Sequence, residues 1–166
     1  RQVSGTFETS ATVTNGHLLG LSGVIQINAG GSFTSSPNYS GEATLLYNTP
    51  YSTSFEWIDG ATVGPGVPKH VTVRAAAGSL SVAGNGHTVL GNLTVESGFL
   101  SLDPDSVGLA LVGNLVSTPV IDLSNSALVC IGDARQTLTA PALLLQSLRL
   151  NKSGASVVLA TDLDCG

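Results

Sequence analysis

The sequence is poor in charge, in aromatic side chains and in sulfur. Of its 166 residues, 10% are charged and 5% are aromatic, with two cysteines, one tryptophan and no methionine. Soluble domains carry roughly 25% charged residues, and helical bundles place these residues on their outer faces. The low charge therefore disfavours an all-helical architecture. Disorder is also disfavoured, because 42% of the residues are hydrophobic and the net charge is only −5.

Basic residues are scarce and scattered. The six Lys and Arg form no stripe that could displace counterions from phosphates, so we expect no nucleic-acid partner. No apolar run approaches the roughly 18 residues of a membrane-spanning helix; the best run, 140–145, is short and contains Pro141. We therefore expect no membrane span. A Ser- and Thr-rich, Lys-poor composition is common in secreted proteins and predicts an extracellular or cell-surface location.

The two cysteines do not indicate a metal site. Cys130 and Cys165 are 35 residues apart, with no Cys-x-x-Cys pair and no histidine nearby, so zinc would lack its ligands. Two interpretations stay open. We favour a buried structural Cys130; the alternative is a Cys130–Cys165 disulfide, which needs Cα atoms about 4.4–6.8 Å apart.

Short alternations of apolar and polar residues dominate the sequence. Runs such as 24–27, 71–73, 93–95 and 148–150 alternate between apolar and polar side chains and are bounded by Gly, Asn, Asp or Pro. Such runs predict short β-strands joined by tight turns.

Two sequence markers recur at a nearly constant interval. An aliphatic residue followed by Gly and then Asn or Asp occurs at 90–92, 112–114 and 131–133, in steps of 22 and 19 residues. A second series begins at Gly78, Gly98 and Pro119, in steps of 20 and 21 residues. Two markers that advance together indicate one structural unit per 20 residues or so.

A unit of this length cannot bury its own apolar face, so the units must stack. Stacked strands and turns predict an all-β parallel β-helix, or β-solenoid, of about 20 residues per coil. The alternative is a β-sandwich, whose strands recur every 8–12 residues. A sandwich does not require markers at a constant interval, and we favour the solenoid.

One stretch interrupts the recurrence and divides the chain into three parts. We predict N-terminal solenoid coils over 1–48, an irregular connection rich in aromatics, Gly and Pro over 49–68, and regular coils over 69–166. Spacing alone leaves open whether these form one continuous domain.

Several passages resemble the repeat regions of long secreted bacterial surface proteins. They are 136–139 with 144–159, 37–48 with 55–57, and 84–95. The resemblance implies a right-handed parallel β-helix outside the cell, of the kind found in adhesins, filaments and matrix components. It also implies a longer parent chain, because chains of this family continue past the point that matches 162–166. The last coil would then be covered by another segment or subunit.

No residues have the spacing of a catalytic or metal-binding motif. His17, His70 and His87 lie in predicted turns, and none has an acidic partner at ligand spacing. The carboxylate pairs at 103–105 and 162–164 fit no calcium-binding repeat, so we favour solvated turn residues. We expect no catalytic residue, no metal and no cofactor, and predict that the chain is not an enzyme.

The leading hypothesis is an extracellular structural or adhesive module. It would self-assemble into a filament or surface layer, or form part of a longer surface protein, with copies of itself or other surface and matrix components as partners. The alternative is a carbohydrate-binding module that stacks glycans on Tyr51, Phe55 and Trp57. Core packing of Trp57 and Phe55 is the competing interpretation of those aromatics.

Three sequons provide candidate N-glycosylation sites. Their asparagines are Asn38, Asn92 and Asn151. Because the chain is rich in Asn, Ser and Thr, about two such sequons would arise by chance, so the sequons alone do not show that the chain is glycosylated.

Overall fold

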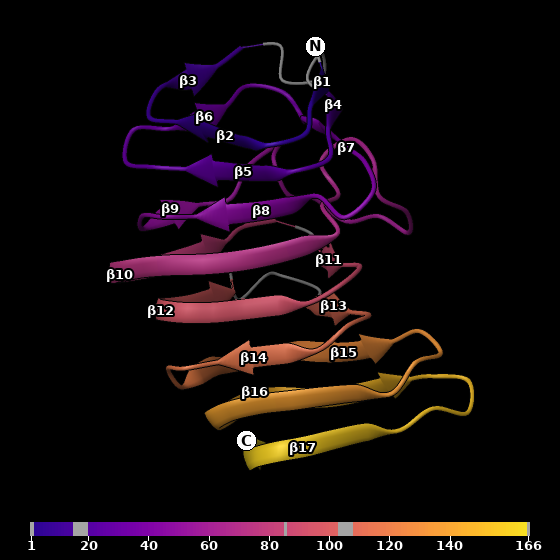
Figure 1. Ribbon diagram of the computed structural model, residues 1–166. Coiled ribbons are helices and arrows are strands. Elements are labelled where there is room, and N and C mark those ends of the chain that lie inside the picture. The colour runs from indigo at the N-terminus through magenta and orange to yellow at the C-terminus, as the bar shows by residue number, and fades with distance from the viewer. Residues whose placement is uncertain (1, 15–19, 85, 103–107, 166) are drawn as a thin grey trace.

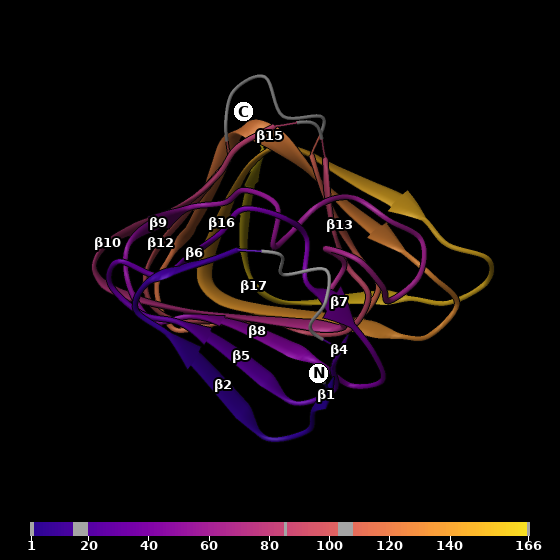
Figure 2. The ribbon, with the colours of Figure 1, turned by 90° about the horizontal axis from the view of Figure 1, so that it is seen from above.

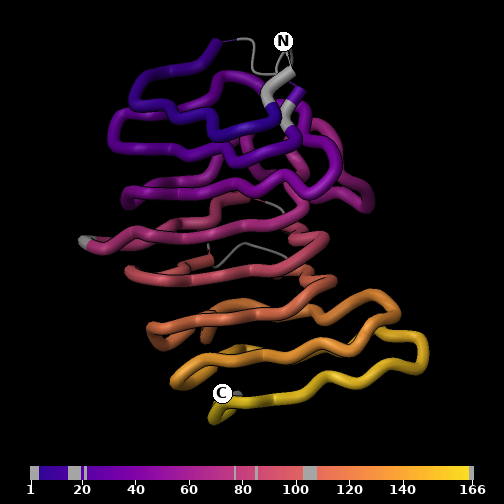
Figure 3. The backbone as a smooth tube through the Cα atoms, in the orientation of Figure 1, coloured from indigo at the N-terminus to yellow at the C-terminus, as the bar shows by residue number. Residues whose placement is uncertain are grey.

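Every regular element that the structure describes is a β-strand. The computed structural model describes residues 2–14, 20–84, 86–102 and 108–165. Their strands stack along one axis, with the two ends of the chain at opposite ends of the stack (Figures 1 and 3). The predicted all-β class and β-solenoid are confirmed, and the β-sandwich alternative is wrong.

Each coil has three sides, which we call the first, second and third faces (Figure 2). The first face contains β2 (Thr6–Thr9), β5 (Val24–Ile27), β8 (Thr44–Tyr47), β14 (Leu115–Ser117) and the beginnings of β10 (His70–Val82), β12 (Leu93–Leu102), β16 (Gln136–Asn151) and β17 (Val157–Cys165). The second face contains β3 (Thr12–Val13), β6 (Ser32–Phe33), β9 (Tyr51–Ser52), the later parts of β10, β12 and β17, the middle of β16, and the start of β15 (Ile121–Ile131). The third face contains β1 (Gln2–Val3), β4 (Gly20–Leu21), β7 (Asn38–Tyr39), β11 (His87–Val89), β13 (Leu109–Leu111) and the ends of β15 and β16.

The strands of successive coils pair in parallel and in register. On the first face the register passes from Phe7 through Ile25, Leu45, Val71, Leu93, Leu115 and Leu138 to Leu159. The solenoid thus has about seven turns, each of about 20 residues, the short end of the range for repeat proteins. Seen from the N-terminal end, the chain runs clockwise as it recedes from the viewer, so the solenoid is right-handed (Figure 2).

Inward-facing aliphatic side chains form continuous columns. One column on the first face contains Ile25, Leu45, Val71, Leu93, Leu115 and Leu138, all fully or almost fully buried. Burial of each such side chain contributes about 1.5–3 kcal/mol relative to exposure. Each column member is covered only by the coils above and below it, which is why a single coil cannot be stable alone.

The aliphatic–Gly–Asn markers form a corner of the coil. The Gly113 amide donates to the Gly91 carbonyl over 2.9 Å, and a Cβ on Gly113 would clash with that carbonyl oxygen. Beside the glycines, the Asn92 side chain accepts from the Asn114 amide over 2.9 Å, and the Asn114 side chain accepts from the Thr137 amide over 2.8 Å. The marker therefore combines close backbone approach with a side-chain ladder one coil apart.

The segment 49–68 lengthens one coil. In the first-face register it separates Thr44 from its partner His70, which is the longest distance in sequence between paired residues of successive coils. After β9 it crosses the third face without a parallel strand. Instead, the Tyr39 amide donates to the Gly64 carbonyl, and the Gly66 amide donates to the Pro37 carbonyl. Because β8 pairs with β10 beyond the segment, one ladder joins the coils on its two sides. The three-part division of the chain stays an interpretation of the sequence.

Candidate functional site

The three aromatics proposed for glycan stacking lie in different environments. Trp57 is fully buried, with its ring centroid 6.4 Å from that of Tyr47 and 5.1 Å from that of His87. Tyr51 is half-buried and lies 5.4 Å from Tyr47, whereas Phe55 is 51% exposed. Trp57 therefore fills the core, as the packing interpretation holds, and Phe55 does not. Glycan contact at these residues stays a prediction.

Behind Trp57, the same segment buries a carboxyl group that the sequence analysis did not single out. Glu56 is fully buried; its Oε1 accepts from the Tyr47 hydroxyl over 2.9 Å and from the Ser54 amide over 3.0 Å. The Tyr39 hydroxyl donates to the Glu56 carbonyl oxygen over 2.8 Å. Oε2 has no hydrogen-bond partner among the described residues. Burial raises the pKa of Glu56 above its usual value, and the bonds to Oε1 oppose that shift only in part.

The tyrosines around Glu56 are held in their neutral forms. Burial, followed by the neighbouring carboxyl group, raises the pKa of Tyr39 and Tyr47 well above the usual value. The same causes raise the pKa of Tyr51 to about 12. Tyr47 therefore keeps the proton that it donates to Glu56 throughout the physiological pH range.

A buried histidine lies on the other side of Trp57. The Nε2 atom of His87 is 3.5 Å from the Thr53 hydroxyl, and the Trp57 indole donates to the Thr88 carbonyl over 2.9 Å. Burial lowers the pKa of His87, with the nearby Asp59 charge among the opposing causes. Thr53, Glu56 and His87 are all buried. An acid, a base and a hydroxyl thus lie buried in one part of the core.

No metal-ligand cluster is found around the described cysteine, Cys130. In the part of the chain that the structure describes, no three His, Cys, Asp or Glu residues are grouped so that they could hold a metal ion. Cys130 is a buried free thiol in a column between Leu111 and Leu150, and burial raises its pKa. Cys165 is in register with Leu145, on another face. The interpretation of Cys130 as a buried structural residue is confirmed.

The sequon asparagines all lie at the surface. Asn38 is exposed on β7, Asn92 at the corner before β12, and Asn151 at the end of β16. Exposure is necessary for glycosylation but does not test it. Asp103, Asp105 and His17 lie outside the described residues.

Three core columns end in the last coil that the structure describes. Leu150, Leu159 and Leu163 are 61%, 40% and 37% exposed. Their partners one coil earlier are Cys130, Leu138 and Leu143, all completely buried. Each leucine lies on a different face, and among the described strands β17 pairs only with β16. We call the three leucines and the open edge of β17 the C-terminal surface (lowest coil in Figures 1 and 3).

The alternation at 148–150 predicted Leu150 as a strand residue but not its exposure, and the prediction of turn residues at 162–164 is wrong, because Leu163 lies within β17. Alternation indicates which side chains point inward, and all three leucines do so. Whether an inward side chain is covered depends on the next coil, which a local pattern does not report.

Comparison with known proteins identifies no relative. No family model matches the chain, and no curated protein or solved structure matches it at significant similarity. The resemblance to secreted bacterial repeat proteins therefore rests on the sequence passages alone, and the fold that it implies is what the structure bears out. No helix in the described ranges is long and apolar enough to cross a membrane.

Proposed function

We propose that this chain is a non-enzymatic structural or adhesive solenoid module of the cell surface or extracellular matrix, and that it assembles by stacking its C-terminal surface on the N-terminal coil of a second copy. The observation that supports the proposal is that Leu150, Leu159 and Leu163 end otherwise buried columns, so that a second copy or a further coil of a longer surface protein would be needed to cover them. Exposed leucines at the ends of buried columns are apolar surface that a covering coil or partner would remove from water. The unpaired edge of β17 adds a template for a further parallel strand.

A second copy is a suitable occupant because its N-terminal coil continues the same pattern. Phe7 begins the first-face column that Leu159 ends, and Phe7 is itself only half-buried. Placed below Leu159, it would extend the column by one further coil. The two surfaces differ from each other, so the contact is head-to-tail and generates a filament when the rotation does not close.

The low charge of the chain supports assembly by stacking. Like residues recur every coil at about 4.8 Å, so charged rungs would repel one another along a filament. Uncharged polar side chains stack without this cost, as in the chain itself, where the Asn48 side-chain amide donates to the Asn28 side-chain oxygen over 2.9 Å. The composition supports the extracellular location, because the chain is rich in Ser and Thr and poor in Lys.

Analytical ultracentrifugation and negative-stain electron microscopy of the purified chain would test the proposal. We expect concentration-dependent end-to-end rods from the unmodified chain and loss of these rods in Leu159→Lys. Leu163→Lys, which removes a second column end, should have the same effect.

The matched control is Val116→Lys, on the side wall of β14, where Val116 is 48% exposed. It adds the same charge away from the C-terminal surface and should leave the rods intact. Hydrogen exchange of β16 would confirm that the variants keep their last coils. Monomeric particles at every concentration, or equal loss in all three variants, would refute self-stacking at this surface.

A further inference from the structure

The aliphatic residues of the aliphatic–Gly–Asn markers lie outside the core. They are Leu90, Val112 and Ile131, and each is half-buried. Each directly follows a completely buried residue of a third-face column, so the alternation of a strand turns it outward. The markers therefore place aliphatic side chains on the outer wall of the third face at three successive levels. Corner geometry explains the Gly and Asn of the marker but not this column.

Part of the aliphatic column lies in a groove of about 380 Å³. Residues 59–61 of the aromatic segment line the groove together with outward residues of the third face, which are Thr88, Leu90, Ala110, Val112 and Ile131. The volume falls within the roughly 300–1,000 Å³ of sites for small ligands. Ala110 has the smallest side chain among these third-face residues, and it leaves the groove open at its level.

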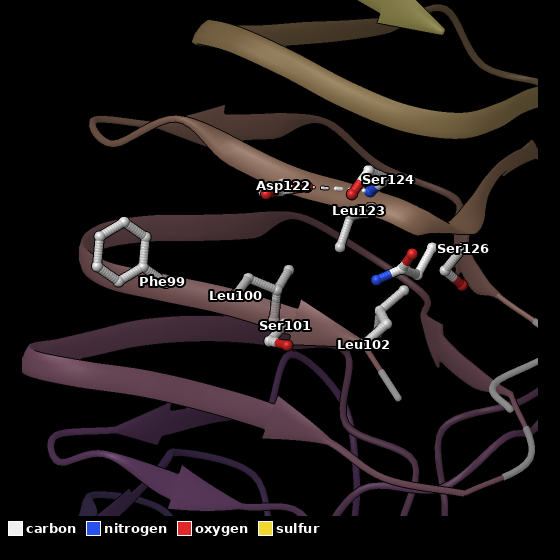
Figure 4. A pocket seen from close by; sticks show the side chains of 9 residues that line it. Phe99, Leu100, Ser101, Leu102, Asp122, Leu123, Ser124 and Ser126 are labelled. Atoms are coloured by element: carbon white, nitrogen blue, oxygen red, sulfur yellow. Dashed lines mark hydrogen bonds between the residues drawn. The ribbon is translucent and has the colours of Figure 1, made fainter. Parts of the chain in front are cut away.

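A smaller hollow lies on the second face, where β12 and β15 do not pair. It has a volume of about 210 Å³, and Figure 4 shows the exposed Phe99 ring and the buried Ser126 hydroxyl at its opposite ends. One small ligand could not contact both groups, so we assign no ligand to this gap. In the groove of the third face, the polar and apolar groups lie at adjacent levels instead.

Asp59 carries the only charge among the described residues that line the groove. The Thr88 hydroxyl donates to Asp59 Oδ1 and holds the carboxylate one level before Ala110, because Thr88 and Ala110 are in register. Neither ion pair found among the described residues includes Asp59. Burial lowers the pKa of the neighbouring His87, so the neutral imidazole does not compensate the carboxylate.

A carboxylate beside an aliphatic surface selects a cation with an apolar body. The Asp59 charge attracts a cation and repels an anion, which excludes nucleotides and carboxylic acids. Leu90, Ala110 and Val112 offer apolar surface to a carbon chain or ring, whose burial contributes about 25 cal/mol per Å². Adjacent parallel strands are about 4.8 Å apart, so a small amine is long enough to reach from Asp59 to Ala110.

We propose that this groove binds an organic amine, with the ammonium group at the Asp59 carboxylate and the apolar body over Leu90, Ala110 and Val112. The site is independent of self-stacking. It lies on the outer wall of the third face, whereas the C-terminal surface consists of the column ends of the last described coil. Either proposal can therefore fail without the other.

The experiment is a titration of the full ¹⁵N-labelled chain, followed by two-dimensional NMR. The probes are hexylamine and 2-phenylethylamine, with 2-phenylethanol and 3-phenylpropionate as neutral and anionic analogues of the second amine. We expect at least one amine to shift the backbone amides of 59–61, 88–90 and 110–112 in a saturable manner. The alcohol should bind at least about threefold more weakly than the matching amine, and the acid more weakly still.

Two variants separate the charge from the apolar surface. Asp59→Asn keeps an oxygen acceptor for the Thr88 hydroxyl and should remove the preference for the amine over the alcohol. Ala110→Ile fills the groove and should abolish the binding of both. The matched controls are Asp122→Asn, which removes a charge on the second face, and Val129→Ile, which adds bulk one coil beyond Ala110 and outside the groove. Both controls should bind as the unmodified chain does.

Unchanged amide positions outside the groove would show that the variants are folded. The proposal is overturned if neither amine shifts the amides of the groove, or if the alcohol binds the unmodified chain as tightly as the amine. It is also overturned if Ala110→Ile binds the amine unchanged, or if Val129→Ile loses binding equally. The comparison of amine, alcohol and acid uses the unmodified chain, so it does not depend on the folding of any variant.

Discussion

The aromatic segment 49–68 and the regular coils 69–166 are stabilised in different ways. In the regular coils, parallel ladders and aliphatic columns repeat the same contacts at every level, and a corner asparagine repeats with them. The aromatic segment has no parallel strand on the third face. It is joined to the core by unique side-chain contacts centred on Glu56 and Trp57.

This difference shows two solutions to one geometric problem. Where the coils keep a nearly constant length, aliphatic side chains of similar size fill the interior. Where the segment 49–68 lengthens the coil between Thr44 and His70, an indole ring and a carboxyl group are buried in addition to aliphatic side chains. Repeated contacts distribute the stability over many residues, whereas unique contacts concentrate it. Substitutions in the two regions should therefore differ in size and in pH dependence.

The largest expected effect is that of Trp57→Ala. Removing a fully buried indole leaves a cavity and an unpaired Thr88 carbonyl, and should cost about 3–5 kcal/mol of unfolding free energy. Hydrogen exchange should increase in β8 and β11 together with the segment itself. Chemical denaturation followed by fluorescence of an added reporter dye would give the free energy.

The matched substitution in the regular coils is Leu115→Ala, which removes one member of the first-face column. It should cost less than Trp57→Ala and increase exchange in β12, β14 and β16 only. A larger loss from Leu115→Ala would show that the aromatic segment is a covering loop and not part of the core.

The second prediction concerns pH and Glu56. Its pKa is raised in the folded chain, so folding favours the protonated carboxyl, surrounded by the neutral hydroxyls of Tyr39, Tyr47 and Tyr51. The stability from this proton is fully present below the ordinary value of 4.5 and is lost as pH rises through the folded pKa. The loss can reach about 1.4 kcal/mol per pH unit. Glu56→Gln keeps an oxygen acceptor for Tyr47 and should remove this dependence.

Thermal unfolding from pH 4 upward would measure the effect, with Glu96→Gln on the regular coils as the control. Glu96 is an exposed acid whose pKa the Arg74 guanidinium lowers, so its contribution has the opposite sign and is lost as pH falls. If Glu56→Gln and the unmodified chain lose stability equally between pH 5 and 8, the carboxyl is ionised in the fold.

How far the sequence predicts the structure also differs between the two regions. The markers at 90–92 and 112–114 indicated the repeating unit correctly, because close stacking requires Gly and amide acceptance requires Asn at the same corner of each coil. The series at Gly78, Gly98 and Pro119 is confirmed at its first step, where Ser79 pairs with Phe99. At its second step, from Gly98 to Pro119, the recurrence continues in the sequence, but β12 and β15 do not pair. The spacing of the markers does not indicate this loss of pairing.

In the aromatic segment, local patterns carried less information. Burial of Trp57 depends on contacts with Tyr47 and His87, which come from two separate strands. Glu56 lies between Phe55 and Trp57 in a stretch rich in turns, where an acidic residue is most simply interpreted as solvated. Its burial follows from the positions of Tyr39 and Tyr47, which come from earlier strands of the chain. No periodicity in the sequence indicates that contact.

The third prediction tests the corner ladder of the regular coils. Asn114→Ala removes the acceptor of the Thr137 amide and should cost about 0.5–1.5 kcal/mol. The loss is smaller than in the aromatic segment because the flanking ladders of β14 and β16 remain. Exchange of the Thr137 amide should increase, whereas Asn151→Ala, at the exposed end of β16, should leave it unchanged. Equal exchange in both variants would show that the side-chain ladder does not contribute to stability.

The smallest expected effect is that of the exposed ion pair on the regular coils. Arg74 donates through Nε to Glu96 Oε2 over 2.6 Å and through Nη2 to Oε1 over 3.0 Å, one coil apart on β10 and β12. Both side chains are nearly half exposed, so solvent and salt screen the pair, and Arg74→Gln should cost no more than about 0.2–1 kcal/mol.

A double-mutant cycle of Arg74→Gln and Glu96→Gln, at low and at high salt, would isolate the pair from the rest of the coil. The coupling should shrink at high salt because exposed charges are screened within about 10 Å at 0.1 M ionic strength. A coupling as large as the Trp57→Ala loss, or one insensitive to salt, would mean that the regular coils also depend on unique side-chain contacts. The contrast between repeated and unique stabilisation would then not hold.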